Sequence, residues 1–99
     1  MEIKIQALHF DATEKLNAFI QKKVAKLEKN HENITKVEVT LKVVKPETAM
    51  NKETELHLFV PGAEFHAEKV CGTFEEGVDL CVDILQRQLE KYKEKQRGK

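Results

Sequence analysis

Hydrophobic and polar residues alternate with a period of two in four stretches of the chain, and they follow a helical period in two longer stretches. Period-two alternation is typical of a strand with one buried face, and a period near 3.6 is typical of an amphipathic helix. The pattern predicts, in order, a strand at 2–8, a helix at 11–30, strands at 34–45, 54–60 and 63–71, and a helix from 73 to about 95.

This β-α-β-β-β-α order predicts an α+β fold in which a four-stranded sheet carries both helices on one face. Such a sheet buries the apolar stripes of both helices together with one of its own faces. A chain of 99 residues is the size of one domain, so we expect a single domain over 1–99, ordered to about residue 95. The predicted buried residues are Leu16, Phe19, Ile20, Val24 and Leu27 in the first helix, Val37, Val39, Leu41 and Val43 in the second strand, and Phe74, Val78, Cys81, Val82, Leu85 and Leu89 in the second helix.

Local signals mark where the elements begin and turn. Asp11 and Glu14 have the spacing of a capping box, which predicts Asp11 as the N-cap of the first helix. Thr73 and Glu76 repeat this spacing at the start of the second helix. The Pro-Gly pair at 61–62 predicts a tight hairpin turn between the third and fourth strands.

Cellular location is indicated by two absences in the sequence. No apolar run approaches the roughly 20 residues that cross a bilayer, and the first ten residues lack the basic start and apolar block of a signal peptide. We therefore expect a cytoplasmic protein with no membrane partner. Cys71 and Cys81 are too few for a disulfide framework or a four-cysteine zinc site, and they are predicted to be small core residues.

Charge is distributed unevenly along a chain whose net charge is zero. Residues 1–45 carry a net charge of +3, residues 46–83 carry −7 and residues 84–99 carry +4. Such asymmetry indicates partners more clearly than the net charge does. Helical spacing gathers the basic residues into one outer stripe on each helix, which comprises Lys15, Lys22, Lys26 and Lys29 with Lys23 beside it on the first helix, and Arg87, Lys91 and Lys95 with Lys93 nearby on the second.

Two helices side by side would join these stripes into one continuous basic surface, which suits a phosphate backbone. The same lysines also fit an ordinary solvated surface, and basic residues near the end of a helix interact favourably with its dipole.

Several stretches resemble the short bacterial ribosome hibernation-promoting factors and the related ribosome-associated inhibitor protein Y, also called sigma-54 modulation proteins. These stretches are "FIQKKVAKLEK" at 19–29, "ITKVEVTLKVVK" at 34–45, "EFHA" at 64–67 and "DILQRQLEKYKEK" at 83–95, with "RQLEKYK" as the most specific part. The resemblance covers about residues 1–97.

The resemblance implies a fold similar to a double-stranded-RNA-binding domain and a function on the ribosome. A member of this family binds the small ribosomal subunit, where it occupies the decoding channel and competes with mRNA and tRNA. Basic residues that match the rRNA-binding positions of the family are Lys23, Lys26, Lys29, Lys42, Lys45, Arg87, Lys91, Lys93 and Lys95, and Lys22 joins them from the helical stripe.

The start of the second helix departs from the family pattern. The family has a segment like "DMYAAID", and this chain has "TFEEGVD" at 73–79, with Glu75 and Glu76 in place of the tyrosine and an alanine. Ile84 replaces a common lysine. These changes lower the positive potential at the start of the helix.

His57 and His66 are the weak candidates for a metal site. A two-residue Pro-Gly turn would pair position 57 with 66, and Glu55, Glu64 or Glu68 would supply a carboxylate, which is plausible zinc chemistry. Two such histidines also fit a polar outer face. No spacing suggests a catalytic triad and no glycine-rich phosphate loop occurs, so neither an enzyme activity nor a cofactor is predicted.

A protein-interaction module is the alternative function. The sheet face that the helices leave open, with the acidic middle segment, would suit a basic protein, and pairing of edge strands would give a homodimer. The acidic residues of this segment are Glu47, Glu53, Glu55, Glu64 and Glu68.

Overall fold

The structure is a computed structural model that describes residues 1–99 apart from 9, 32, 45–49 and 98–99. Its element order confirms the predicted β-α-β-β-β-α arrangement. The elements are β1 (Glu2–Leu8), α1 (Glu14–Asn30), β2 (Lys36–Val43), β3 (Lys52–Val60), β4 (Ala63–Cys71) and α2 (Phe74–Arg97).

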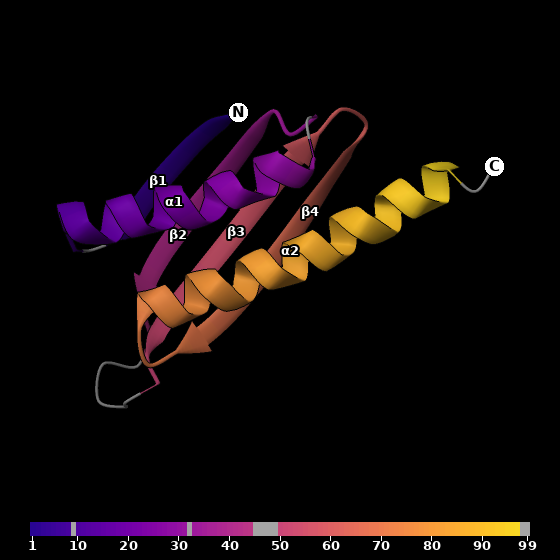
Figure 1. Cartoon of the computed structure of the whole chain (residues 1–99). Coiled ribbons are helices and arrows are strands. Elements are labelled where there is room, and N and C mark those ends of the chain that lie inside the picture. Colours follow the sequence, from indigo (N-terminus) through magenta and orange to yellow (C-terminus); the bar gives the residue numbers. More distant parts are fainter. Residues whose placement is uncertain (9, 32, 45–49, 98–99) are drawn as a thin grey trace.

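The four strands form one mixed sheet in the order β1-β2-β3-β4. β1 pairs with β2 in parallel, whereas β2–β3 and β3–β4 are antiparallel. A parallel pair needs a crossover connection, and α1 supplies it between β1 and β2. Both helices lie on one face of the sheet, with α2 against β3 and β4 and α1 beside α2 (Figure 1).

The core lies between this helical layer and the sheet. The predicted stripes of both helices are buried in it, except that Phe19 is only partly buried. Val37, Val39 and Leu41 fill the sheet side as predicted. The opposite face of the sheet is open to solvent, and we call it the outer sheet face.

Val43 was predicted to be buried, and this prediction is wrong, since its side chain is 38% exposed. It is the last residue of β2, which is shorter than the predicted strand at 34–45. Beyond the two ends of β2, single backbone hydrogen bonds join Thr35 N to the Phe59 carbonyl and Val44 N to the Asn51 carbonyl. The regular pairing of β2 with β3 stops at Lys36 and Val43. β3 begins two residues before its predicted start, and α2 continues to Arg97.

The N-cap of α1 is Thr13, so the prediction of Asp11 is wrong. Thr13 Oγ1 accepts a hydrogen bond from Leu16 N at 3.1 Å, and its carbonyl accepts one from Asn17 N. A hydroxyl that accepts from the third residue of the helix satisfies a donor that has no partner within the helix. In α2 the prediction is confirmed, because Thr73 Oγ1 accepts from Glu76 N at 3.2 Å.

The hairpin between β3 and β4 turns at Pro61 and Gly62, as predicted. Gly62 has φ of 83°, a left-handed conformation that glycine adopts without steric cost. The two-residue turn pairs Val60 with Ala63, and this register continues along both strands to His57 opposite His66.

At Gly77, in the first turns of α2, the helix lies very close to the sheet. A Cβ atom built on Gly77 would lie 2.5 Å from Thr54 Oγ1 and 2.9 Å from Thr54 Cβ. Thr54 is fully buried, and its hydroxyl has no hydrogen-bond partner within the described part of the chain. The close approach therefore depends on a residue without a side chain at position 77.

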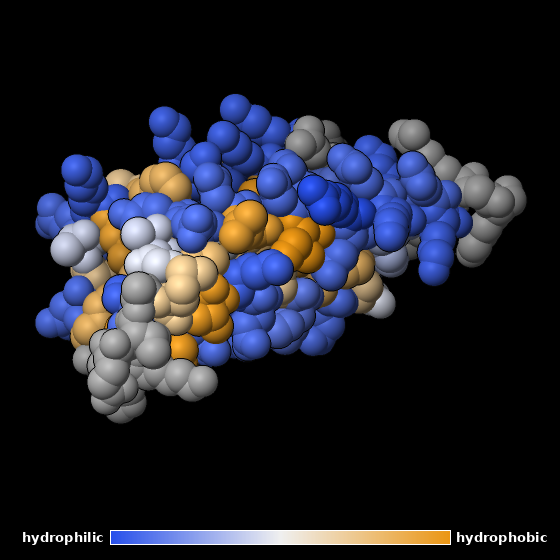
Figure 2. All heavy atoms as spheres, turned by 90° about the horizontal axis from the view of Figure 1, so that it is seen from below, coloured by the Kyte–Doolittle hydropathy of each residue, from blue (hydrophilic) through white to orange (hydrophobic). Residues whose placement is uncertain are grey.

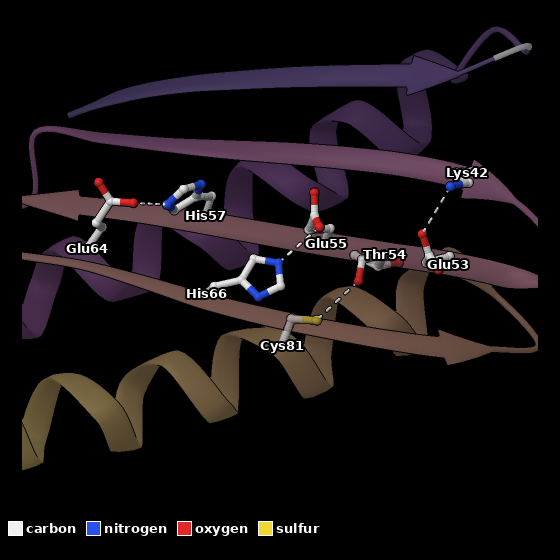
Figure 3. A network of polar contacts seen from close by, with 8 residues as sticks. All are labelled: Lys42, Glu53, Thr54, Glu55, His57, Glu64, His66 and Cys81. Carbon is white, nitrogen blue, oxygen red and sulfur yellow. Dashed lines mark hydrogen bonds and ion pairs between the residues drawn. The ribbon is translucent and has the colours of Figure 1, made fainter.

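Cys71 and Cys81 are buried, free thiols, as predicted from the sequence. Cys81 Sγ donates to the Thr54 carbonyl at 3.6 Å (Figure 3). Burial raises the pKa of Cys81 from its ordinary value of 9.0 to about 12, and burial also raises the pKa of Cys71. Neither thiol is therefore available as a thiolate at neutral pH.

We expect both thiols to resist alkylation in the native protein at pH 8 and to react at once when the protein is unfolded. Because the pKa of Cys81 is higher in the folded state, the unfolded state loses its proton first, so the free energy of unfolding falls as the pH rises from about 9 to about 12. Mass spectrometry after iodoacetamide treatment with and without urea tests the protection. Rapid labelling of Cys81 in the folded protein would contradict it.

Candidate nucleic-acid interface

The α1 stripe is the set of lysines on the exposed side of α1. Leu16, Ile20, Val24 and Leu27 turn the opposite side of the helix into the core. The helical period therefore directs the stripe away from the sheet and toward solvent. Its members are Lys15, Lys22, Lys26 and Lys29, and all four are exposed.

Lys23 lies at the boundary between α1 and α2 and is turned toward the second helix. Its Nζ lies 3.0 Å from Asp79 Oδ1. The hydrogen bond and charge of Asp79 raise the pKa of Lys23 above its ordinary value of 10.5, and the charge of Asp83 adds to the effect. Lys23 also lies over the ring of Phe19, with 5.6 Å from Nζ to the ring centroid. The charge of Lys23 is therefore paired within the protein.

The α2 stripe comprises Arg87, Lys91 and Lys95, all exposed. The last turns of α2 continue beyond the sheet (Figure 1), so solvent surrounds much of this segment. Seen from below, the surface toward the C-terminus is hydrophilic, whereas hydrophobic atoms gather nearer the other end (Figure 2). Tyr92 anchors the segment by its edge-on contact with Phe65, at 5.4 Å between ring centroids.

Three acidic residues of α2 lie on the side that faces α1, and we call Asp79, Asp83 and Glu90 the acidic seam. The charges of Asp79 and Asp83 raise the pKa of Lys23. His31 lies at the end of α1. Burial and the charge of Lys93 lower the pKa of its imidazole, whereas the charge of Glu90 raises this pKa. The seam therefore follows the line along which the two helices meet.

The acidic seam corrects the prediction of one continuous basic surface. At 3.6 residues per turn, Lys91 and Lys95 lie about 100° or more around α2 from Glu90. Lys91 and Lys95 therefore point away from the side of α2 nearest α1, whereas Arg87, about 40° around the helix from Asp83, borders the seam. The helical layer presents two basic stripes on either side of a line of carboxylates. Lys93 lies on the side of the seam, near His31.

Lys42 lies on the outer sheet face, opposite the helical layer. Its Nζ is 3.8 Å from Glu53 Oε2 across β2 and β3 (Figure 3). The structure therefore does not bring Lys42 together with the two helical stripes. Lys45, the other predicted strand residue, and Glu47 of the acidic set lie outside the described residues.

His57 and His66 are directly paired across β3 and β4, as the turn predicted. Both lie on the outer sheet face, where each imidazole contacts a carboxylate (Figure 3). His57 Nε2 lies 2.7 Å from Glu64 Oε1, and His66 Nε2 lies 2.9 Å from Glu55 Oε2.

The acidic seam has a signal of its own in the sequence, which the pattern of basic residues does not contain. Asp79, Asp83 and Glu90 are separated by four and seven residues, which places them on one side of a helix just as the same spacings place the lysines of α1. The spacing alone does not tell which side of α2 faces α1.

Comparison with known proteins places these features in a family. Residues 3–97 match the family described as sigma 54 modulation protein / S30EA ribosomal protein. The chain is 33% identical over 98 residues to the ribosome hibernation promoting factor of Pseudomonas putida, covering 99% of this chain and 92% of the relative. It is 35% identical over 95 residues to the protein of that name from Escherichia coli strain K12, covering 96% of each.

Two solved structures share the fold. One is a ribosomal subunit interface protein from Coxiella burnetii, with a TM-score of 0.82 and 22% identity over 94% of this chain and 98% of the other. The second is the N-terminal domain of protein Y from Thermus thermophilus, with a TM-score of 0.80 and 20% identity over 93% of this chain and 99% of the other. None of the helices in the described ranges is long and apolar enough to cross a membrane. By the match over residues 3–97 and the identity to its relatives, the chain belongs to the sigma 54 modulation protein / S30EA ribosomal protein family.

Proposed function

We propose that this protein is a ribosome hibernation factor that binds the small ribosomal subunit through its helical layer. The observation that carries the proposal is the pair of exposed basic stripes on the two helices of one layer, in a chain whose relatives are named ribosome hibernation promoting factors. The α1 stripe and the α2 stripe contact rRNA phosphates, with lysines as point charges and Arg87 as a planar fork.

The mechanism is steric occlusion of the channel that mRNA and tRNA occupy during decoding. The protein is elongated, with principal-axis extents of 50 × 23 × 18 Å, and the projecting end of α2 accounts for part of its length (Figure 1). Phosphate contacts supply affinity, and the shape of the docked domain selects the site, as is common for folded RNA. No bond is made or broken in this mechanism.

Residues of the candidate set contribute differently in this proposal. Lys22, Lys26 and Lys29 act with Arg87, Lys91 and Lys95 as direct phosphate contacts. Lys23 holds α1 against α2 through Asp79, and Lys93 lies at the seam. Lys42 matches a family position and lies on the outer sheet face, so it contacts rRNA only if the channel encloses the domain from both sides. Lys45 also matches a family position and lies outside the described residues.

Sedimentation with purified small ribosomal subunits tests the function. We expect the protein to co-sediment at low salt, to dissociate as the salt concentration rises, and to be displaced by added tRNA. Salt sensitivity follows from the release of counterions when cations of the protein neutralise phosphates. Failure to co-sediment at low salt would overturn the ribosomal function, and co-sedimentation unaffected by tRNA would overturn occlusion of the decoding channel.

Removing charge from the acidic seam is expected to strengthen binding. The double change Asp79→Asn and Asp83→Asn frees Lys23 and removes two negative charges between the stripes, so the affinity for small subunits should rise by about two- to tenfold at low salt. Quantitative sedimentation over a range of protein concentrations measures the change. The matched control is Glu64→Gln with Glu68→Gln on the outer sheet face, which removes two negative charges there and should leave affinity unchanged. Weaker binding of the seam variant would show that the seam contacts a cationic partner.

Charges on the outer sheet face are largely paired with one another, which favours the helical layer as the binding surface over the outer sheet face. Lys36 Nζ lies 3.4 Å from Glu38, and Lys42, His57 and His66 contact carboxylates of the same face. A protein-interaction function on this face would give binding that changes little with salt, and the sedimentation series separates the two.

A further inference from the structure

The outer sheet face carries an imidazole close to two carboxylates on β3 and β4. The register pairs Glu55 directly with Glu68, and His66 lies two residues before Glu68 on the same side of β4. Residues two apart on a strand share a face, so the turn at Gly62 determines that these three side chains meet.

Their ligand atoms are already close together. The imidazole nitrogen of His66 and the carboxylate oxygens of Glu55 and Glu68 all lie within 4.8 Å of one another. His66 Nε2 and Glu55 Oε2 are 2.9 Å apart, and the two side chains point toward each other from neighbouring strands (Figure 3). All three residues are at least partly exposed, so an ion has an open path to them.

Glu55 and Glu68 are like charges placed directly opposite each other, an arrangement that destabilises a sheet. His66 contacts Glu55, whereas Glu68 makes no hydrogen bond or ion pair within the described residues. A cation between the two carboxylates would remove their repulsion and give Glu68 a partner.

We propose that Glu55, His66 and Glu68 bind a divalent transition-metal ion, for which Zn²⁺ is the best fit. One imidazole with two carboxylates suits zinc, whereas Mg²⁺ and Ca²⁺ prefer oxygen ligands throughout. Ligand atoms about 2.0–2.2 Å from zinc in a tetrahedron lie roughly 3.4 Å apart, so rotation of the exposed side chains is enough to form the site. Water completes the coordination.

The site has only three protein ligands and is open to solvent, so it binds more weakly than a closed four-ligand site. We expect one Zn²⁺ per chain with a dissociation constant on the order of micromolar. Binding adds two positive charges to a face that belongs to the most acidic segment of the chain, residues 46–83 with a net charge of −7.

Calorimetric titration of the isolated protein with ZnCl₂ and with MgCl₂ tests the proposal. His66→Gln and Glu68→Gln should each weaken zinc binding at least tenfold, and magnesium should produce no comparable heat. The matched control is Glu38→Gln, which removes one carboxylate from β2 on the same face and should bind zinc like the unchanged protein. Absence of zinc binding would overturn the proposal, and so would zinc binding that both ligand variants retain.

The unfolding temperature, measured with and without zinc, is a second test. It separates metal binding by Glu68 from a purely structural role of this residue. Without metal, Glu68→Gln should raise the unfolding temperature, because it removes the repulsion from Glu55. With zinc, the unchanged protein should gain stability and the variant should not. Equal gains in both proteins would place the ion elsewhere. These measurements need no ribosome, so their failure would leave the proposed function untouched.

Discussion

Changing Lys26, Arg87 and Lys91 to glutamate is expected to abolish binding to the small ribosomal subunit at moderate salt. The three residues lie in the two exposed stripes of the helical layer, and each change replaces attraction to phosphate with repulsion. We expect the affinity at low salt to fall on the order of 100-fold or more, and the slope of log affinity against log salt to decrease by about three, one for each lost contact. Sedimentation at four or five salt concentrations gives both quantities.

The matched control reverses three lysines on strands, Lys4, Lys36 and Lys69, and so makes the same change in net charge. If contacts with the helical layer carry the binding, this control should lose far less affinity than the helical variant. Circular dichroism should show that both variants are folded, since all six residues are at least partly exposed. Full co-sedimentation of the helical variant would show that the assigned surface is wrong, and equal losses in the two variants would show that binding depends only on net charge.

Replacing Gly77 with alanine is expected to destabilise the protein despite the higher helix propensity of alanine. The propensity favours alanine by about 1 kcal/mol in an exposed helix. At this position the new Cβ would lie 2.5 Å from Thr54 Oγ1 and 2.9 Å from Thr54 Cβ, and the latter atom moves only with the backbone of β3. Overpacking of this kind costs about 1–3 kcal/mol beyond the propensity gain, so the midpoint of urea unfolding should fall.

Thr54→Ala provides the partner for a double-mutant cycle. It removes the hydroxyl closest to position 77, an atom that has no hydrogen-bond partner among the described residues. The double variant should therefore be more stable than the sum of the two single effects predicts, by about 1 kcal/mol. Ala18→Gly on the exposed side of α1 is the control for propensity and should show no coupling to Thr54→Ala. Additive effects at positions 54 and 77 would contradict the close approach.

Hydrophobic periodicity predicted the helices and strands because it depends only on residues that are close together in the sequence. The strands at 2–8 and 63–71 have the predicted bounds, and the buried stripe of α2 is the predicted one. The pairing of His57 with His66 was predictable for a related reason, since a two-residue turn determines the register of a hairpin. Where two signals compete within a few residues, as Asp11 and Thr13 do, the pattern does not select between them. The hydroxyl of Thr13 reaches Leu16 N because the helix begins at Glu14.

The sequence by itself determined the family, the order of elements and the presence of a basic stripe on each helix. Only the tertiary structure decided how those stripes are arranged. The rotation of α2 about its own axis depends on its contacts with β3 and β4, including Thr54 against Gly77, and these residues are distant in sequence. That rotation directs Asp79 toward Lys23, and it turns Lys91 and Lys95 away from α1. Helical spacing predicts which residues lie on the same side of a helix. Packing of the helix against the sheet determines which neighbour that side faces.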